Sequence, residues 1–95
     1  MAAYLIAEIE VLDAQLYGEY RKHVPPLIAA YGGRYLVRGG ALEVKEGDWA
    51  PRRLVLLEFP SMEQARRFYD SPEYAPFLAL RKKATRSKLI FMEGL

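Results

Sequence analysis

The sequence contains no cysteine and a single histidine, His23. Without cysteine the chain has no disulfide, no thiol nucleophile and no thiolate metal ligand. One histidine is too few for a multi-histidine metal site within one subunit, and we therefore expect neither a metal nor another cofactor.

Amides and long apolar runs are also scarce. The chain has no asparagine and two glutamines, Gln15 and Gln64, which is consistent with a thermophilic source because amides are thermolabile. The longest apolar runs are only a few residues, too short to cross a bilayer. The first residues lack the basic stretch of a signal peptide and soon reach Glu8. We therefore expect a cytoplasmic protein that does not enter the membrane.

Charge gives no strong indication of a polyanionic partner. There are 14 basic and 12 acidic residues, for a net charge of +2. The basic run Arg81-Lys82-Lys83 comes where a helix is expected to end, and cations are favoured there. We therefore expect no nucleic-acid partner. The length of 95 residues, 52% of them hydrophobic, predicts one folded domain spanning 1–95.

The first half of the chain predicts a strand followed by a helix. Residues Ala3 to Val11 alternate between an apolar and a mixed face, as in a half-buried strand. Asp13 is a candidate N-cap, and apolar residues then recur at helical spacing up to Tyr31. Pro25-Pro26 interrupts this pattern, because each proline lacks an N–H and clashes with the preceding turn. We therefore expect two helical pieces meeting near His23.

Two glycine pairs, Gly32-Gly33 and Gly39-Gly40, bracket the next segment. The first pair is expected to end the helix in a left-handed conformation. Arg34 to Arg38 is expected to form a strand with Arg34, Leu36 and Arg38 on one face. The second pair is expected to bend this strand, and Ala41 to Lys45 to continue it.

The remaining chain predicts strand, helix and strand. Arg53 to Phe59 alternates, and Ser61 with Gln64 matches a capping box. Ser71-Pro72 is expected to start a further helix, which runs to about Ala84. Ser87 to Glu93 is the final strand.

The order strand, helix, strand, strand, helix, strand is that of the ferredoxin-like α+β fold, with a four-stranded antiparallel sheet and helices on one face. The open face then carries a set of apolar residues: Tyr4, Ile6, Leu54, Leu56, Ile90 and Met92. Two copies packed sheet to sheet would bury these side chains, so we expect a homodimer. The alternative is a solvated face with scattered charges.

Several motifs resemble those of the domain of unknown function 1330 family. They are Pro25-Pro26, Tyr31-Gly-Gly-Arg34, Leu36-Val37-Arg38-Gly39-Gly40, Glu46-Gly47-Asp48-Trp49 and Tyr69-Asp-Ser-Pro-Glu-Tyr74. The resemblance spans nearly the whole chain and implies the dimeric α+β barrel superfamily. Its members include cofactor-free monooxygenases, haem-degrading enzymes and lactone isomerases. The family has no assigned activity, so no catalytic residue is carried over.

The candidate site residues each have a structural alternative. His23 is a candidate general base, but a lone histidine near a helix end also caps carbonyls or points to water. Arg34 and Arg38 are candidates to bind a carboxylate or phosphate, or to pair with Glu8 and Glu58. Three tyrosines are candidate pocket walls or core residues: Tyr20, Tyr31 and Tyr74.

The sequence therefore predicts a small-molecule-binding protein or a cofactor-independent enzyme. We expect its pocket between sheet and helices, and a small anionic or aromatic ligand. The alternative is a non-catalytic homodimeric interaction module whose polar sheet residues only fix the interface.

Overall fold

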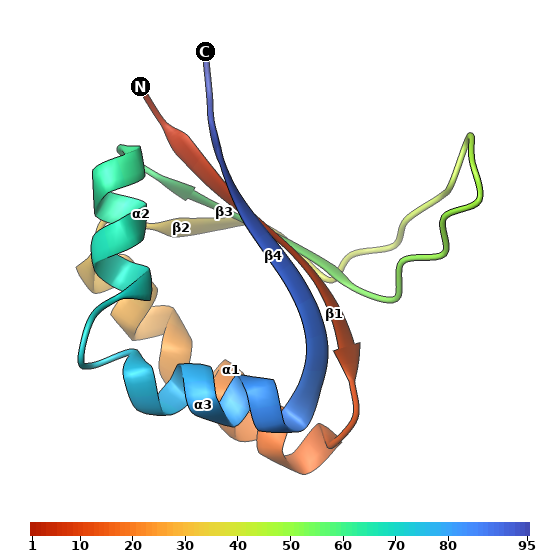
Figure 1. Cartoon of the computed structure of the whole chain (residues 1–95), viewed down its shortest axis with the longest axis horizontal. Helices are drawn as coiled ribbons and strands as arrows, with labels where there is room; N and C mark the ends of the chain where they lie inside the picture. Colours follow the sequence, from red (N-terminus) through yellow and green to blue (C-terminus); the bar gives the residue numbers. More distant parts are fainter.

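The computed structural model describes all 95 residues, Met1–Leu95. The elements, in chain order, are β1 (Ala3–Val11), α1 (Ala14–Ala30), β2 (Arg34–Arg38), β3 (Leu54–Phe59), α2 (Met62–Tyr69), α3 (Ala75–Ala84) and β4 (Thr85–Glu93). The strands form one antiparallel sheet in the order β2-β3-β1-β4, and the helices cover one of its faces (Figure 1). The predicted ferredoxin-like α+β fold is confirmed. None of the helices is both long and apolar enough to cross a membrane.

The alternation along the strands decides which side chains enter the core. On β1, the side chains of Ala3, Leu5, Ala7 and Ile9 are buried against the helices, and those between them lie on the open face. Strand β3 follows the same rule. The largest fully buried side chains are Tyr74, Phe59, Phe68 and Val24. Burying a phenylalanine of this kind contributes about 1.5–3 kcal/mol.

Helix α1 is continuous, and the predicted break at Pro25-Pro26 is wrong. The helix begins after Asp13, whose carboxylate accepts a hydrogen bond from the Leu16 N–H at 3.1 Å. It runs through both prolines to Ala30. Pro25 leaves the carbonyl of Arg21 without its helical partner. A side chain supplies the missing donor: Arg38 Nη2 lies 3.2 Å from the Arg21 oxygen.

Strand β2 contains a bulge that the sequence analysis missed. Tyr35 pairs with Leu57, but Val37 pairs with the adjacent Leu56, so that Leu36 is the extra residue. The prediction that Arg34 and Arg38 share a face is therefore wrong. Arg34 lies on the open face opposite Glu58, whereas Arg38 lies opposite Val55 on the face that the helices cover.

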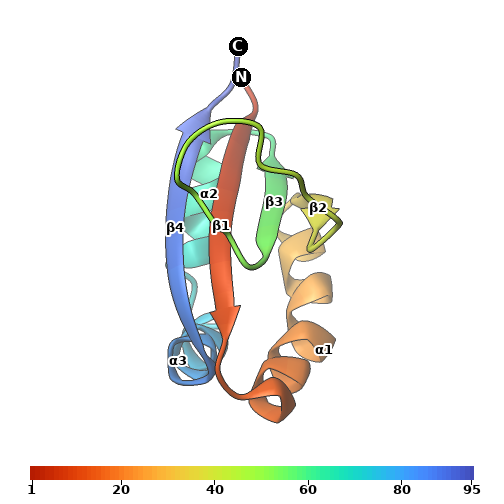
Figure 2. The ribbon, with the colours of Figure 1, turned by 90° about the vertical axis from the view of Figure 1, so that its right-hand side faces the viewer.

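Residues 39–53 form a long loop, and the predicted continuation of the strand over Ala41–Lys45 is wrong. The segment has no neighbouring strand to pair with, and every residue from 40 to 50 is exposed. Its apolar side chains Leu42, Val44 and Trp49 are 41%, 44% and 57% exposed. Figure 2 shows the loop passing in front of β1 and β4 on the open side of the sheet.

The helix caps in the second half are mostly as predicted. The Ser61 hydroxyl accepts from the Gln64 N–H at 3.1 Å and begins α2. The Ser71 hydroxyl accepts from the Tyr74 N–H at 3.1 Å. However, the residues that follow Ser71 make a turn, and α3 begins only at Ala75. Its end at Ala84 is as predicted, and β4 begins two residues earlier than expected, at Thr85.

Candidate functional site

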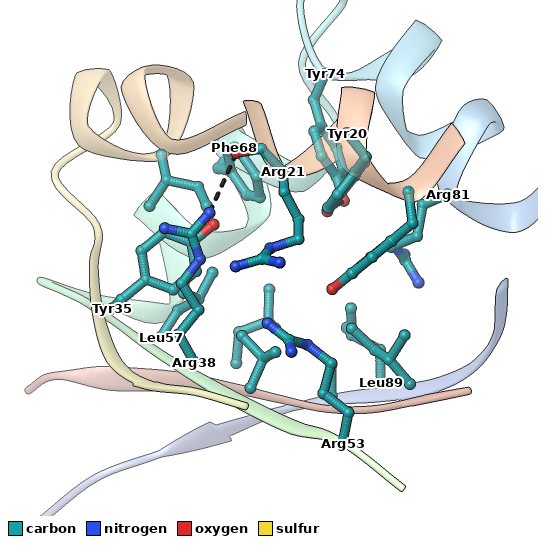
Figure 3. Close-up of a pocket in the computed structure, with 16 residues that line it drawn as sticks. Tyr20, Arg21, Tyr35, Arg38, Arg53, Leu57, Phe68, Tyr74, Arg81 and Leu89 are labelled. Atoms are coloured by element: carbon teal, nitrogen blue, oxygen red, sulfur yellow. Dashed lines mark hydrogen bonds between the residues drawn. The ribbon is translucent and has the colours of Figure 1, made fainter. Parts of the chain in front are cut away.

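A pocket lies between the helices and the covered face of the sheet (Figure 3). Its enclosed volume is about 30 Å³, which holds about two water molecules. The sheet side is apolar and is formed by Leu5, Ala7, Ile9, Val55, Leu57 and Leu89. The aromatic lining residues are Tyr17, Tyr20, Tyr35, Phe68 and Tyr74.

Ile28 and four arginines complete the lining, which contains no carboxylate. The arginines come from four different parts of the chain: Arg21 lies in α1, Arg38 in β2, Arg53 directly before β3, and Arg81 in α3. Arg21 and Arg38 are exposed and mark the mouth, whereas Arg53 is half-buried. Arg81 is buried, with 4% of its surface exposed. In Figure 3 the side chains of Arg21, Arg38 and Arg53 converge on the same hollow.

Two of these guanidinium groups carry N–H donors that the protein does not satisfy. Arg53 Nε, Arg53 Nη2 and Arg81 Nε are buried and have no hydrogen-bond partner. Such groups are rare in folded proteins, and leaving one unpaired costs about 1–3 kcal/mol or more for a charged group. The pocket therefore holds positive charge and free donors together.

Arg38 reaches the pocket because of the bulge in β2. Its guanidinium carbon lies 4.7 Å from the centre of the Tyr35 ring, a cation–π contact. Burial raises the pKa of Tyr35, and the Arg38 guanidinium opposes that rise. The hydrogen bond from Arg38 to the Arg21 carbonyl ties β2 to α1 across the mouth.

Arg53 reaches the pocket because Gly39 lies beside it. Gly39 has a φ of +69°, in the left-handed region that favours glycine, and a Cβ there would overlap the Arg53 guanidinium. The Arg53 guanidinium carbon also lies 5.7 Å from the centre of the Tyr17 ring. The side chain thus packs near both a glycine backbone and an aromatic ring.

A pair of tyrosines adds hydroxyl groups to the pocket wall. The hydroxyls of Tyr20 and Tyr74 lie 2.6 Å apart, a short hydrogen bond between α1 and the turn before α3. Burial, and then the neighbouring Tyr74, raise the pKa of Tyr20 far above the usual range for tyrosine. Burial alone lowers the pKa of Arg81, but Tyr74 and Tyr20 raise it by more. At neutral pH Tyr20 therefore offers a neutral hydroxyl beside a permanent cation.

The structure brings together three of the six predicted site residues: Arg38, Tyr20 and Tyr74 line the pocket. His23 lies outside it, exposed on α1, 3.5 Å from the Glu19 carboxylate and stacked on Phe77.

Arg34 and Tyr31 also lie outside the pocket. Arg34 Nη2 contacts Glu58 Oε1 at 2.7 Å on the open face of the sheet, so the predicted structural alternative describes its position. The Tyr31 hydroxyl donates to Glu73 at 3.0 Å.

Sequence reasoning did not single out four of the polar or aromatic lining residues: Arg21, Tyr35, Arg53 and Arg81. A signal was available for Arg53, because the alternation of Val55, Leu57 and Phe59 extends back to it and places a cation in a buried row. Arg21 lies one helical turn after Tyr17 on the same face of α1. Arg81 had no such signal, since it begins a basic run at a helix end.

The donor set does not resemble a metal site. No three His, Cys, Asp or Glu side chains come together anywhere in the chain. The guanidinium and phenol groups of the pocket are suited instead to hydrogen bonding with oxygen atoms of an anion.

The fold is shared with several solved proteins. RPA0582 from Rhodopseudomonas palustris, a protein of unknown function, matches with a TM-score of 0.78 and 18% identity, over 99% of this chain and 82% of that one. SnoaB from Streptomyces nogalater, a cofactor-independent oxygenase, matches with a TM-score of 0.69 and 10% identity, over 99% and 93%. A putative antibiotic biosynthesis monooxygenase from Nitrosomonas europaea matches with a TM-score of 0.65 and 14% identity, over 100% and 99%.

At these identities the likeness shows a shared ferredoxin-like α+β fold and no activity. No curated protein matches the sequence. The family model described as "Domain of unknown function (DUF1330)" matches residues 2–95, which is nearly the whole chain. The resemblance of the motifs around Pro25, Gly39 and Tyr74 is therefore confirmed, and the chain belongs to the DUF1330 family.

Proposed function

We propose that this protein binds a small organic molecule in the pocket between its sheet and helices, and acts on it as a cofactor-independent enzyme. The observation that carries the proposal is the set of unsatisfied donors on Arg53 and Arg81, buried in a pocket without a carboxylate. Leaving buried donors without a partner is unfavourable, and a ligand that accepts hydrogen bonds would satisfy them.

The lining residues have complementary parts in this proposal. Arg38 and Arg53 bind the ligand's polar group, and the apolar side chains of β1 and β3 contact its body. Tyr20 and Tyr74 hydrogen-bond to each other and keep one hydroxyl hydrogen free to donate a hydrogen bond to the ligand. SnoaB, a cofactor-independent oxygenase, has the same fold and gives the enzymatic part its plausibility. His23 has no part in this arrangement within one subunit.

We also propose that the protein is a homodimer through the open face of its sheet. Tyr4, Ile6, Leu54 and Leu56 are half-buried there, and Ile90 and Met92 are 52% exposed. With the apolar side chains of loop 39–53 above them, they make a surface that a second copy would bury. The pocket lies on the opposite side of the sheet, so ligand binding and dimerisation are separable by substitution.

The test is a thermal-shift screen against small carboxylates, phosphates, quinones, flavins and haem. A ligand present at a hundred times its Kd adds about 2.7 kcal/mol to the free energy of unfolding, which raises Tm by about 10 °C or more in a domain of this size. Arg38→Ala should abolish the shift and leave the dimer intact. If no compound raises Tm and Arg34→Ala, on the open face, weakens the dimer, the interaction module is the better description.

A further inference from the structure

We infer that the ligand is a small organic acid with an apolar body, whose acid group lies among the guanidinium groups of Arg21, Arg38 and Arg53. This inference rests on the proposed function and specifies the chemical class of its ligand. It is carried by charge, by free hydrogen-bond donors and by the apolar and aromatic lining of the pocket.

The charge of the pocket has no counterion within the chain. All close ion pairs of the protein use cations outside the pocket: His23 with Glu19, Arg34 with Glu58, Arg67 with Glu63, Lys45 with Glu43, and Arg52 and Arg86 with Glu10. None of the four pocket arginines takes part in one. Mutual repulsion of guanidinium groups in a partly buried space is unfavourable, and a bound anion would remove it.

The donors are arranged to receive an oxyanion. Arg53 presents Nε and Nη2, the two N–H positions along one edge of a guanidinium, and neither has a partner. That edge matches the two oxygens of a carboxylate, phosphonate or sulfonate. Arg38 uses Nη2 for the Arg21 carbonyl and keeps other N–H groups for a ligand.

The rest of the pocket suits an apolar body. Ala7, Val55 and Leu57 lie on the sheet side, and the rings of Tyr17 and Tyr35 belong to the lining. The free volume is only about 30 Å³, so a ligand enters as the long, exposed side chains of Arg21 and Arg38 rearrange around it. An aromatic ring bearing an acid group fits this combination of apolar and aromatic lining with cations at the mouth.

The experiment compares three probes that share a phenyl ring: benzoate, phenylphosphonate and the neutral benzamide. Affinities are measured by calorimetric titration of the intact protein at one pH and one ionic strength. We expect at least one of the two anions to bind at least tenfold more tightly than benzamide. This comparison on the unchanged protein does not depend on the folding of any variant.

Two neighbouring arginines supply the matched variants. Arg53→Gln removes the unpaired guanidinium from the pocket, whereas Arg52→Gln removes an exposed cation that lies 4.0 Å from Glu10. Both lower the net charge by one. We expect Arg53→Gln to weaken anion binding at least tenfold and Arg52→Gln to change it less than twofold. Equal effects of the two variants would mean that the anion responds only to net charge, which would overturn the inference.

The remaining outcomes separate the inference from the proposed function. If benzamide bound as tightly as both anions, the inference that the ligand carries an acid group would be wrong, but the proposal of a binding pocket would stand. Binding of a neutral compound from the wider screen, with no binding of either anion, has the same meaning. If neither these probes nor any compound of the screen binds, the proposed function fails together with the inference.

Discussion

Arg38 is the residue on which the largest number of local features converge. Its position on the covered face follows from the extra residue Leu36 in β2. Its hydrogen bond satisfies the Arg21 carbonyl that Pro25 leaves free, and its charge lies over the Tyr35 ring. One side chain therefore stabilises a helix that contains two prolines and also borders the pocket.

This role of Arg38 predicts a coupling with Pro25. Arg38→Ala should lower the free energy of unfolding by about 1 kcal/mol, because a helix carbonyl loses its partner. In a Pro25→Ala background the new N–H bonds the same carbonyl, and the cost of Arg38→Ala should fall by at least about 0.5 kcal/mol. A double-mutant cycle in urea measures this coupling. Additive effects would show that the 3.2 Å contact contributes nothing to the helix.

The Tyr20–Tyr74 pair predicts a loss of stability at high pH. The tyrosine pKa in the unfolded chain is about 10, and burial raises that of Tyr20 well above this value. Above pH 10 the unfolded chain therefore releases its proton first, and the free energy of unfolding falls by up to about 1.4 kcal/mol per pH unit. Below pH 10 this contribution is fully present.

The measurement uses Tyr20→Phe, with Tyr69→Phe as a control that removes a hydroxyl from α2. Tyr20→Phe should cost about 1–3 kcal/mol at pH 7, because the buried Tyr74 hydroxyl loses its partner. Urea unfolding of Tyr20→Phe between pH 9 and 11 should then fall less steeply than that of the wild type and the control, all at one protein concentration. Parallel curves for all three proteins would exclude Tyr20 as the group that titrates.

At the scale of elements, β2 is short but sets the geometry of the pocket mouth. Its bulge turns Arg38 toward the helices, and Gly39 at its end leaves space for the Arg53 guanidinium. The Gly39 N–H donates to the Leu54 oxygen at 2.9 Å and so holds this arrangement against β3. Two arginines from distant parts of the sequence thus reach one hollow through irregularities of one strand end.

The glycine pair provides a prediction with an internal control. Gly39→Ala should cost about 1–2 kcal/mol, because φ is +69° there, and should also displace Arg53. A Cβ at Gly40 would meet no heavy atom within 4 Å, and the φ of Gly40 is not positive. Gly40→Ala should change stability by less than about 0.5 kcal/mol. Chemical unfolding of both variants makes the comparison. Equal effects would mean that the left-handed conformation of Gly39 and its contact with Arg53 do not contribute to stability.

Features that depend on neighbouring residues were predictable from the sequence. The alternation of β1 and the caps at Asp13 and Ser61 are local, and all are present as expected. The continuity of α1 through Pro25 was not predictable in this way, because the compensating donor lies 17 residues from the carbonyl that it satisfies. The bulge was also hidden, since Leu36 is an ordinary strand residue with no glycine or proline to mark it.

The candidate site was predictable only in part for the same reason. The expectation of a pocket between sheet and helices used the fold, and three named residues line the pocket found there. The face of Arg34 followed correctly from the alternation, but that of Arg38 did not, since one inserted residue reverses every side chain after it. Arg81 becomes part of the pocket only when α3 packs across from Tyr20, a contact between distant parts of the chain.

At the scale of the whole molecule, the sheet separates two surfaces with different properties. The covered face holds the arginine pocket, and the open face holds half-buried and exposed apolar residues with paired charges at Arg34 and Glu58. Loop 39–53 lies on the same side as the open face (Figure 2). The cytoplasmic location and the thermophilic source expected from composition stay predictions, because they concern the environment of the molecule and not its shape.

The open face predicts a dimer that a single charge disrupts. Leu56 lies at its centre, paired with Ile6 on one side and Val37 on the other. Leu56→Glu places a carboxylate in the middle of the proposed interface, where burial without a partner costs several kcal/mol. Sedimentation equilibrium should give twice the 10.9 kDa of one chain for the wild type and a single chain's mass for the variant.

The control for this substitution is Gln15→Glu, which adds the same charge at an exposed position near the start of α1. It should remain dimeric, because α1 covers the face of the sheet that is opposite the proposed interface (Figure 1). Since the pocket is also on that side, Leu56→Glu should still bind any ligand found for the wild type. A wild-type mass of one chain would exclude this dimer, whereas loss of ligand binding in Leu56→Glu would mean that the pocket needs the second subunit.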